Sequence, residues 1–356
     1  MIELSLMSES HFEQHMDFSM TQQEPPKPAE PEVPAAELPK PNDVMLGENV
    51  AERQAILAQL QSETPDLGPE DHENALRMIE RAQESERVLS AVLERLYPER
   101  ASVEKEHAAI ERELQGEIVE MQELGGGKNT PLRIRLEGGR EAVFKPRGRD
   151  VQVRFGIQPG EYAGREWLAF QIDRALRLDI VPHTTLRDVP QHEVGSVQVW
   201  SEGKVALLDR DWKSKADVRT TETLALFDTL VMSSDRNEGN FLVDADQGGR
   251  VVAIDNGLVL SSEEKSDHFR SAVLEEGVCA GKELSLENAE RLEAFLASPE
   301  LQQALNQAFG AVLGEHATKL WDGFIARVKK YAAPNAKLPE SKRTGNGVKF
   351  DLVEHS

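Results

Sequence analysis

The 356-residue sequence predicts an α+β fold in two lobes, an antiparallel β-sheet lobe followed by a helical lobe, with a helical extension in front. Before residue 124, apolar residues recur at steps of three and four, which indicates amphipathic helices. Between 131 and 200, apolar residues alternate with polar ones, which indicates strands. After Gly203, longer apolar runs indicate helices again.

The net charge of −22 is unevenly distributed. Residues 1–120 hold 27 acidic and 10 basic residues, and the remainder holds 36 acidic and 31 basic ones. Such a surface repels nucleic acid, which is therefore not an expected partner. The single cysteine, Cys279, excludes a disulfide framework and fits a reducing compartment.

Neither a membrane span nor a secretory signal peptide is visible in the sequence. No apolar run approaches the roughly 18–20 residues that a spanning helix needs. The N-terminus lacks a basic region followed by an apolar one. We therefore expect a cytoplasmic protein, and export by a route that needs no such signal stays open.

The first 124 residues divide into two predicted segments. Residues 1–45 are rich in proline and glutamate and cannot build a core, which predicts a disordered tail. Residues 46–124 are predicted to be an acidic helical extension, with helices near 56–60, over 76–96, and from 103 through 121. The extension either packs on the neighbouring domain or on a second copy of the chain, which is the interpretation we prefer, or binds a partner protein through residues 48–120.

Residues 125–202 are predicted to form the strand-rich first lobe. Its opening stretch, Gly125–Thr130, lacks the spacing of a phosphate-binding P-loop. It is either a linker or a glycine-rich turn over the phosphates of a nucleotide, where Lys128 would contact the ligand. A hairpin with its turn at 137–140 follows, and then a helix over 164–176 and further strands to Trp200.

Residues 203–336 are predicted to form the helical lobe, and residues 337–356 a loose tail. The run from Thr223 to Met232 is almost entirely apolar, so this helix is expected to be buried. It leads directly into a loop that contains Asp235. The acidic stretch at 244–249 lacks the length and ligand spacing of a calcium loop and is interpreted as a hairpin turn.

Five residues occur in the order that phosphoryl transfer requires: Lys145, Glu166, Asp235, Asn240 and Asp255. Such chemistry needs a strand lysine for the phosphates, a helix glutamate that orients this lysine, and a loop aspartate that accepts the proton of the acceptor hydroxyl. It also needs oxygen ligands for a divalent metal. Each residue alone has an ordinary structural explanation. Together, and on the expected element types, they predict a phosphotransferase.

At these residues the chain resembles the phosphatidylinositol 3-/4-kinase superfamily, and within it the type II phosphatidylinositol 4-kinases. The Golgi casein-kinase and actin-fragmin kinase families share much of the pattern. The similar motifs run from about 131 to 335: Ala142–Pro146, Glu166, Leu178–Thr184, Gly195–Trp200, Ser234–Asn240 and Ala253–Leu258. The resemblance implies a two-lobed, atypical protein-kinase-like fold that uses ATP and Mg²⁺ or Mn²⁺.

The resemblance also implies roles for individual residues. Asp235 would be the catalytic aspartate, and Asn240 and Asp255 would ligate the metal. Lys145, oriented by Glu166, would hold the ATP phosphates. The stretch Gln198, Val199 and Trp200 would meet the adenine ring.

The acceptor is left open by two departures from the lipid kinases. The chain lacks their cysteine-rich, palmitoylated insert, and the stretch 261–270 carries three acidic residues against two basic ones. Phosphatidylinositol is the first expectation, and a protein serine or threonine is the alternative. A pseudokinase scaffold that binds a partner through its helical extension, or an enzyme that transfers AMP, are further alternatives.

Overall fold

The computed structural model describes residues 69–124, 131–149, 156–190, 193–263, 268–344 and 347–350. The predicted tail at 1–45, the predicted helix near 56–60 and the glycine-rich turn with Lys128 lie outside these residues.

The first lobe is built on a five-stranded antiparallel sheet with the strand order β1-β2-β3-β5-β4. The strands are β1 (Ile118–Glu123), β2 (Leu132–Leu136), β3 (Glu141–Pro146), β4 (Thr184–Val189) and β5 (Glu193–Val199). β2 and β3 form the predicted hairpin, whose turn is closed by the Gly139 N–H donating to the Leu136 carbonyl at 2.8 Å. Helix α4 (Tyr162–Leu176) connects β3 to β4 and is buried along its whole length.

The predicted third helix is wrong in its second half. Helix α3 (Ala101–Leu114) ends before Gly116, and residues 118–123 form β1 instead. Ile118 and Met121 pair with Leu136 and Ile134 of β2. Their spacing of three also fits a helix, so the apolar pattern alone could not reveal that they pair with the strand that starts at Leu132.

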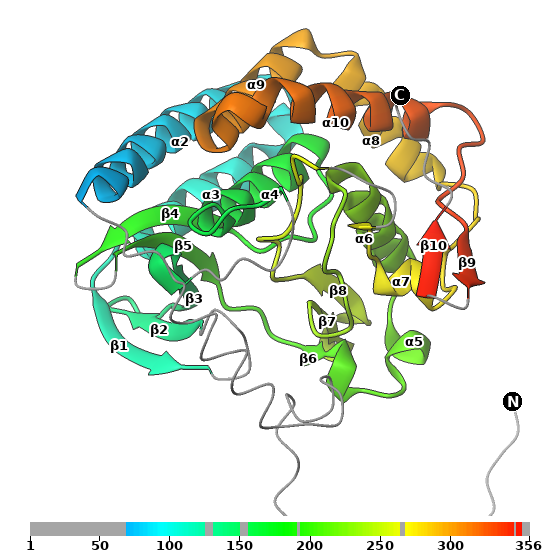
Figure 1. Ribbon diagram of the computed structural model, residues 1–356, viewed down its shortest axis with the longest axis horizontal. Coiled ribbons are helices and arrows are strands. Elements are labelled where there is room, and N and C mark those ends of the chain that lie inside the picture. The colour runs from blue at the N-terminus through cyan, green and yellow to red at the C-terminus, as the bar shows by residue number, and fades with distance from the viewer. Residues whose placement is uncertain are drawn as a thin grey trace, which may run out of the picture. The chain divides into compact units, whose positions relative to one another are not determined.

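The helical extension packs on the rest of the protein, as the preferred interpretation predicts. Helix α2 (Pro69–Leu96) lies along α9 (Pro299–Leu313) and also contacts α4, β4 and β5 (Figure 1). Its buried residues belong to the same apolar core as α4 and the helical lobe. The end of α3 packs instead on a second core formed by the sheet, through Ile110 and Leu114.

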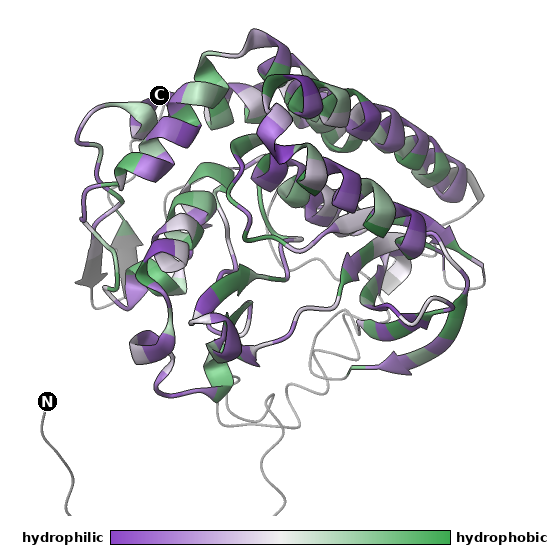
Figure 2. Ribbon diagram, turned by 180° about the vertical axis from the view of Figure 1, so that it is seen from behind, coloured by the Kyte–Doolittle hydropathy of each residue, from purple (hydrophilic) through white to green (hydrophobic). Residues whose placement is uncertain are grey.

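The second lobe combines helices with a small sheet. Its helices are α5 (Trp212–Lys215), α6 (Val218–Val231), α7 (Ala272–Glu275), α8 (Leu286–Leu296), α9 and α10 (Ala317–Ala332). As predicted, α6 is buried: every position from Thr221 to Val231 except Glu222 lies in the core. Polar and apolar residues alternate along the outer helices (Figure 2), because these cover the core with one face and meet solvent with the other. None of the helices in the described part of the chain is long and apolar enough to cross a membrane.

The small sheet has the strand order β6-β7-β8. It links the loop of Asp235 and Asn240, which precedes β7, to Asp255, which follows β8. Its strands are β6 (Lys204–Val205), β7 (Phe241–Asp244) and β8 (Arg250–Ala253). The turn between β7 and β8 is the predicted hairpin turn, in which Asp244 accepts hydrogen bonds from the N–H groups of Asp246 and Gln247. This aspartate therefore stabilises a turn.

Part of the predicted C-terminal tail is structured. β9 (Ser341–Thr344) and β10 (Gly347–Phe350) form an antiparallel pair. The reason is burial at both ends, because Leu338 enters the core and the Phe350 ring packs edge-on against Phe269 at 4.8 Å. Two isolated apolar residues in a polar stretch gave too weak a pattern to predict this.

Candidate active site

Three of the predicted site residues meet around one ammonium group. Lys145 on β3 donates to Glu166 Oε1 on α4 and to Asp255 Oδ1, two residues beyond β8, at 2.9 Å. The Glu166 side chain is 2% exposed, that of Lys145 20% and that of Asp255 56%. The cluster is therefore closed on the α4 side and open to solvent at Asp255.

Close packing on α4 brings the segment after β8 to Glu166. A Cβ atom at Gly257 would lie 3.1 Å from Tyr162 Cβ and 3.6 Å from Glu166 Oε1, so a larger residue would push the segment away. Arg165, the neighbour of Glu166, donates to the carbonyls of Val259, at 2.8 Å, and Leu260. Helix α4 thus supplies both the acidic partner of Lys145 and the anchor of the chain that carries Asp255.

Electrostatics fixes the protonation of this cluster. The ammonium of Lys145 lowers the pKa of Asp255 below its ordinary value. Burial lowers the pKa of Lys145, but the carboxylates of Asp255 and Glu166 more than offset it, so the pKa is raised. Both Lys145 and Asp255 are therefore charged at neutral pH.

The loop between α6 and β7 places Asp235 and Asn240 together. The Asn240 amide nitrogen donates to the Asp235 carbonyl at 2.6 Å and to its carboxylate at 3.3 Å. The Asn240 carbonyl in turn accepts from the N–H of Ile254 at 3.1 Å, which sets Asn240 beside the residue that precedes Asp255. The amide nitrogen is used within the loop, and the amide oxygen is the side-chain atom of Asn240 that could ligate a cation.

Arg236 is a further residue of the candidate site, and no motif in the sequence indicates it. Its guanidinium, 1% exposed, donates to Asp228 Oδ1 at 2.9 Å and to the side-chain oxygen of Asn256. It also donates to the carbonyl groups of Asn240 and Ile254, the latter at 2.5 Å. One buried side chain therefore joins α6, the Asp235 loop and the segment of Asp255.

Asp228 completes this buried arrangement. Its second oxygen accepts from the Ser271 hydroxyl at 2.8 Å. Burial raises the pKa of Asp228 to about 6, although Arg236 and Ser271 both act to lower it. At neutral pH it is the charged partner of Arg236. The sequence gives one signal for this pair: Asp228 is a charged residue in an otherwise apolar helix, and Arg236 lies in the loop that follows it.

The predicted adenine-binding residues lie at the end of β5. The Gln198 side chain is buried and donates to the Thr184 hydroxyl at 2.8 Å. The N–H groups of Val199 and Trp200 donate to the carbonyls of His183 and Glu141, at 2.9 and 3.0 Å. These two backbone donors are therefore engaged in the sheet.

The oxygen atoms of Asp255 and Asn240 fit a hard divalent cation. Mg²⁺ and Mn²⁺ prefer carboxylate and amide oxygens, and Mg²⁺ keeps several water ligands and shares phosphate oxygens of its substrate. The exposure of Asp255 leaves room for such further ligands. The donor set is therefore suitable for a metal–nucleotide complex.

A second group of metal-ligating side chains lies outside this site. Glu86, Glu111 and His183 place their ligand atoms within 4.8 Å of one another. His183 is 3.0 Å from Glu111, and Glu86 accepts from Arg174 at 3.3 Å. Burial lowers the pKa of His183 and also that of His107, the latter to about 3, so both rings are neutral at pH 7. In these contacts each carboxylate already has a partner within the protein: Glu111 pairs with His183, and Glu86 pairs with Arg174.

Comparison with known proteins gives distant similarities. No family model matches the chain. Protein Rv2133c of Mycobacterium tuberculosis is 26% identical over 157 residues, which cover 35% of this chain and 55% of that protein. The chain thus matches about half the length of this curated relative.

Two solved structures show a partial likeness. The Golgi casein kinase with Mn/ADP bound aligns over 64% of this chain and 74% of that chain, with a TM-score of 0.43 and 14% identity. The Helicobacter pylori proinflammatory kinase CtkA aligns over 62% and 96%, with a TM-score of 0.39 and 13% identity. Neither likeness supports the narrower resemblance to type II phosphatidylinositol 4-kinases.

The chain's own order of parts assigns its fold. An antiparallel sheet carries Lys145 on its central strand, and the next helix carries Glu166. A helical lobe follows, with Asp235, Asn240 and Asp255 around its small sheet. The protein has the two-lobed, atypical protein-kinase-like fold that the sequence predicts.

Proposed function

We propose that this protein is an ATP-dependent kinase that transfers the γ-phosphate to a hydroxyl group of a protein. The observation that supports this most strongly is the position of Lys145 between Glu166 and Asp255. A strand lysine paired with a helix glutamate, beside an aspartate that can bind metal, is the arrangement that phosphoryl transfer needs. Lys145 and Asp255 come from distant parts of the chain, so their meeting is a property of the fold.

Each predicted residue has a role in this proposal. Lys145 binds the phosphates of ATP, and Glu166 orients its ammonium group. Asp235 positions the acceptor hydroxyl and accepts its proton as the hydroxyl oxygen forms a bond to the γ-phosphorus. The bond from that phosphorus to the β–γ bridging oxygen breaks, and ADP leaves.

Asn240 and Asp255 would hold Mg²⁺ or Mn²⁺ in this site. When bound, the ion neutralises charge on the β- and γ-phosphates. Arg236 keeps its two protein ligands in register, because it donates to the carbonyl groups of Asn240 and Ile254. The adenine ring would meet the backbone beyond Trp200, because the N–H groups of Val199 and Trp200 are engaged in the sheet.

One local feature favours a protein acceptor over a phosphoinositide. Arg270 lies next to the catalytic loop, where its N–H donates to the Ser233 carbonyl at 2.8 Å. Its guanidinium is engaged by both oxygens of Glu275, at 2.6 and 3.1 Å. A phosphoinositide headgroup calls for available positive charge at this place, whereas a basic protein segment tolerates the acidic partner. Phosphatidylinositol stays the second candidate, on the resemblance of the motifs.

An acceptor assay tests the proposal. The purified full-length chain is incubated with γ-labelled ATP and Mg²⁺ or Mn²⁺, once with phosphatidylinositol vesicles and once with a protein lysate. We expect labelled protein bands and unlabelled lipid. The Asp235→Asn variant is the matched control, and its bands should vanish because the hydroxyl loses its proton acceptor.

The other outcomes discriminate among the alternatives. Label in phosphatidylinositol alone would keep the kinase and replace the acceptor. Label in neither sample would contradict the kinase proposal and favour the pseudokinase scaffold. A cytoplasmic location, and export without a signal peptide, stay predictions from the sequence.

A further inference from the structure

Helix α2 lies outside the parts that phosphoryl transfer requires, yet it contacts both lobes. It packs along α9 of the helical lobe and against α4, β4 and β5 of the sheet lobe. Its buried residues share one core with both: Ala75, Ile79, Ala82, Leu89 and Leu93. Moving α4 relative to the helical lobe would therefore disturb α2 as well.

The three helices meet at a point two residues before Glu166. A Cβ atom at Gly164 of α4 would lie 3.1 Å from Val312 Cβ on α9 and 3.3 Å from Met78 Sδ on α2. The absence of a side chain at this position lets α4 sit directly against its two neighbours. Little space is left there for α4 to shift.

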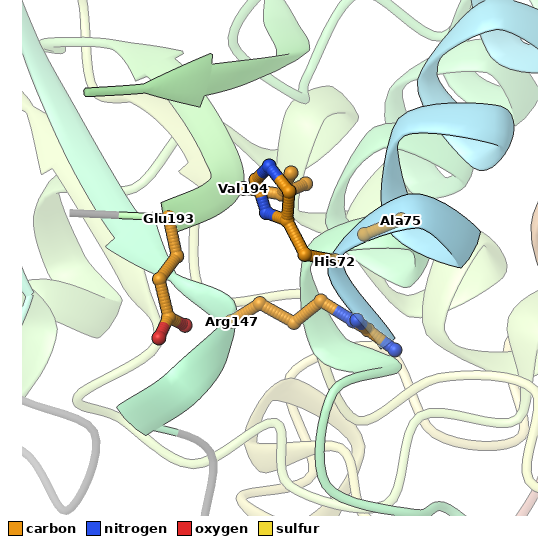
Figure 3. A pocket seen from close by; sticks show the side chains of 5 residues that line it. All are labelled: His72, Ala75, Arg147, Glu193 and Val194. Carbon is orange, nitrogen blue, oxygen red and sulfur yellow. The ribbon is translucent and has the colours of Figure 1, made fainter. Parts of the chain in front are cut away.

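The first turn of α2 is also fixed to the end of β3. Arg147 follows that strand and reaches across to α2, beside a cavity of about 200 Å³ (Figure 3). It donates to the Asp71 carbonyl at 3.2 Å and to the Gly160 carbonyl at 2.6 Å. His72 of α2 lies 3.7 Å from Asp188 at the end of β4. This end of α2 is thereby held to the sheet.

Farther along the helices, polar side chains of α2 and α3 form hydrogen bonds with two residues of α4, Trp167 and Arg174. Glu86 accepts from Trp167 Nε1 and from Arg174 Nη1, both at 3.3 Å. Trp167 and Arg174 are seven residues apart, which places them two turns apart on one face of α4. Arg174 also donates to Ser90 of α2 at 2.8 Å and to Glu104 of α3 at 2.5 Å.

Burial makes these contacts costly to break. Arg174 is 4% exposed and Glu104 is 5% exposed. A guanidinium that loses its acceptors inside a protein becomes an uncompensated charge, so separation of α4 from α2 and α3 is strongly opposed. Burial raises the pKa of Glu86 to about 7, despite the opposing effect of Arg174.

We propose that Arg174 is a positioning residue for the phosphotransfer site, through which α2 and α3 hold α4 in the place that keeps Glu166 on Lys145. Glu166 and Arg174 belong to one continuous helix, so fixing the second fixes the first. A kinase needs this lysine–glutamate pair in order to act on ATP. The helical extension then holds α4 in the position that the site requires. This inference rests on the proposed kinase function.

The test compares Arg174→Met with Arg95→Met, using ATP turnover of the full chain at a temperature where both are folded. Arg95 of α2 forms an exposed ion pair with Glu300 and serves as the matched control. We expect kcat/KM for ATP to fall about tenfold to a hundredfold in Arg174→Met, because small misplacements of reacting groups have such effects. Arg174→Lys should recover part of the activity, and Arg95→Met should behave like the wild type.

A second readout keeps the inference separate from the kinase proposal. Hydrogen exchange of the α4 amides near Glu166 should be faster in Arg174→Met than in Arg95→Met, whether or not the protein turns over ATP. Should Arg174→Met fail to fold, Glu104→Gln removes one charged partner and is expected to show the same changes to a smaller degree. A folded Arg174→Met with unchanged turnover and unchanged α4 exchange would overturn the positioning role. An inactive wild type would contradict the kinase function alone.

Discussion

Replacing Asp255 by alanine is expected to lower phosphate transfer by at least about a thousandfold while leaving the fold intact. The loss follows because the carboxylate is the only charged ligand proposed for the metal. The fold should survive because the Asp255 side chain is 56% exposed and Lys145 keeps its pairing with Glu166. Initial rates of ADP release and circular dichroism of the same samples measure the two effects.

The matched control is Asp246→Ala, which removes an exposed carboxylate from the turn between β7 and β8. It should keep wild-type activity. Melting curves add a binding readout, since a ligand at a hundredfold excess over Kd stabilises a protein by about 2.7 kcal/mol. ATP with Mg²⁺ should raise the melting temperature of Asp246→Ala and much less that of Asp255→Ala. Wild-type turnover by Asp255→Ala would contradict the proposal that Asp255 ligates the metal.

The second large effect is expected at the buried pair Arg236–Asp228. Arg236→Met should reduce the free energy of unfolding by about 3–5 kcal/mol, because it leaves a buried carboxylate without its cation. It should also abolish phosphate transfer, since the guanidinium joins the loop of Asn240 to the segment of Asp255. Urea unfolding gives the first quantity and the transfer assay gives the second.

A double-variant cycle separates the pair from general damage to the loop. Asp228→Leu combined with Arg236→Met removes both charges and should be less destabilised than the sum of the two single changes. Arg219→Met, on the exposed part of α6, is the control for loss of an arginine and should change stability little. Additive losses in the cycle would show that Arg236 and Asp228 do not act as a pair.

Much of the fold could be predicted from the sequence because local patterns decided it. The β2–β3 hairpin has alternating apolar residues about a Gly-Gly turn, and α6 is too apolar to lie anywhere but in the core. The predictions failed where a distant partner decides the structure. Residues 118–123 form a strand only because β2 lies beside them, and Phe350 is ordered by packing on Phe269.

The residues of the candidate site also differ in whether the sequence alone or only the folded chain indicates them. Lys145, Glu166 and Asp255 could be proposed together from the sequence because phosphoryl transfer calls for those side chains on those elements, and the structure brings the three together. Arg236 and Arg174 could not, because an arginine in a loop or on a helix usually meets solvent. Only the folded chain shows that each is buried and joins three elements. The N–H groups of Val199 and Trp200 likewise need the strand register before their engagement is visible.

ATP labelled at one of two positions shows which part of the nucleotide this protein transfers. The full-length chain is incubated with a protein lysate and Mg²⁺ or Mn²⁺, once with γ-labelled ATP and once with α-labelled ATP. The proposed chemistry predicts label in protein from the γ-position only, and its loss in Asp235→Asn. Label transferred from the α-position would show that AMP is the group moved, and would contradict the proposed kinase reaction.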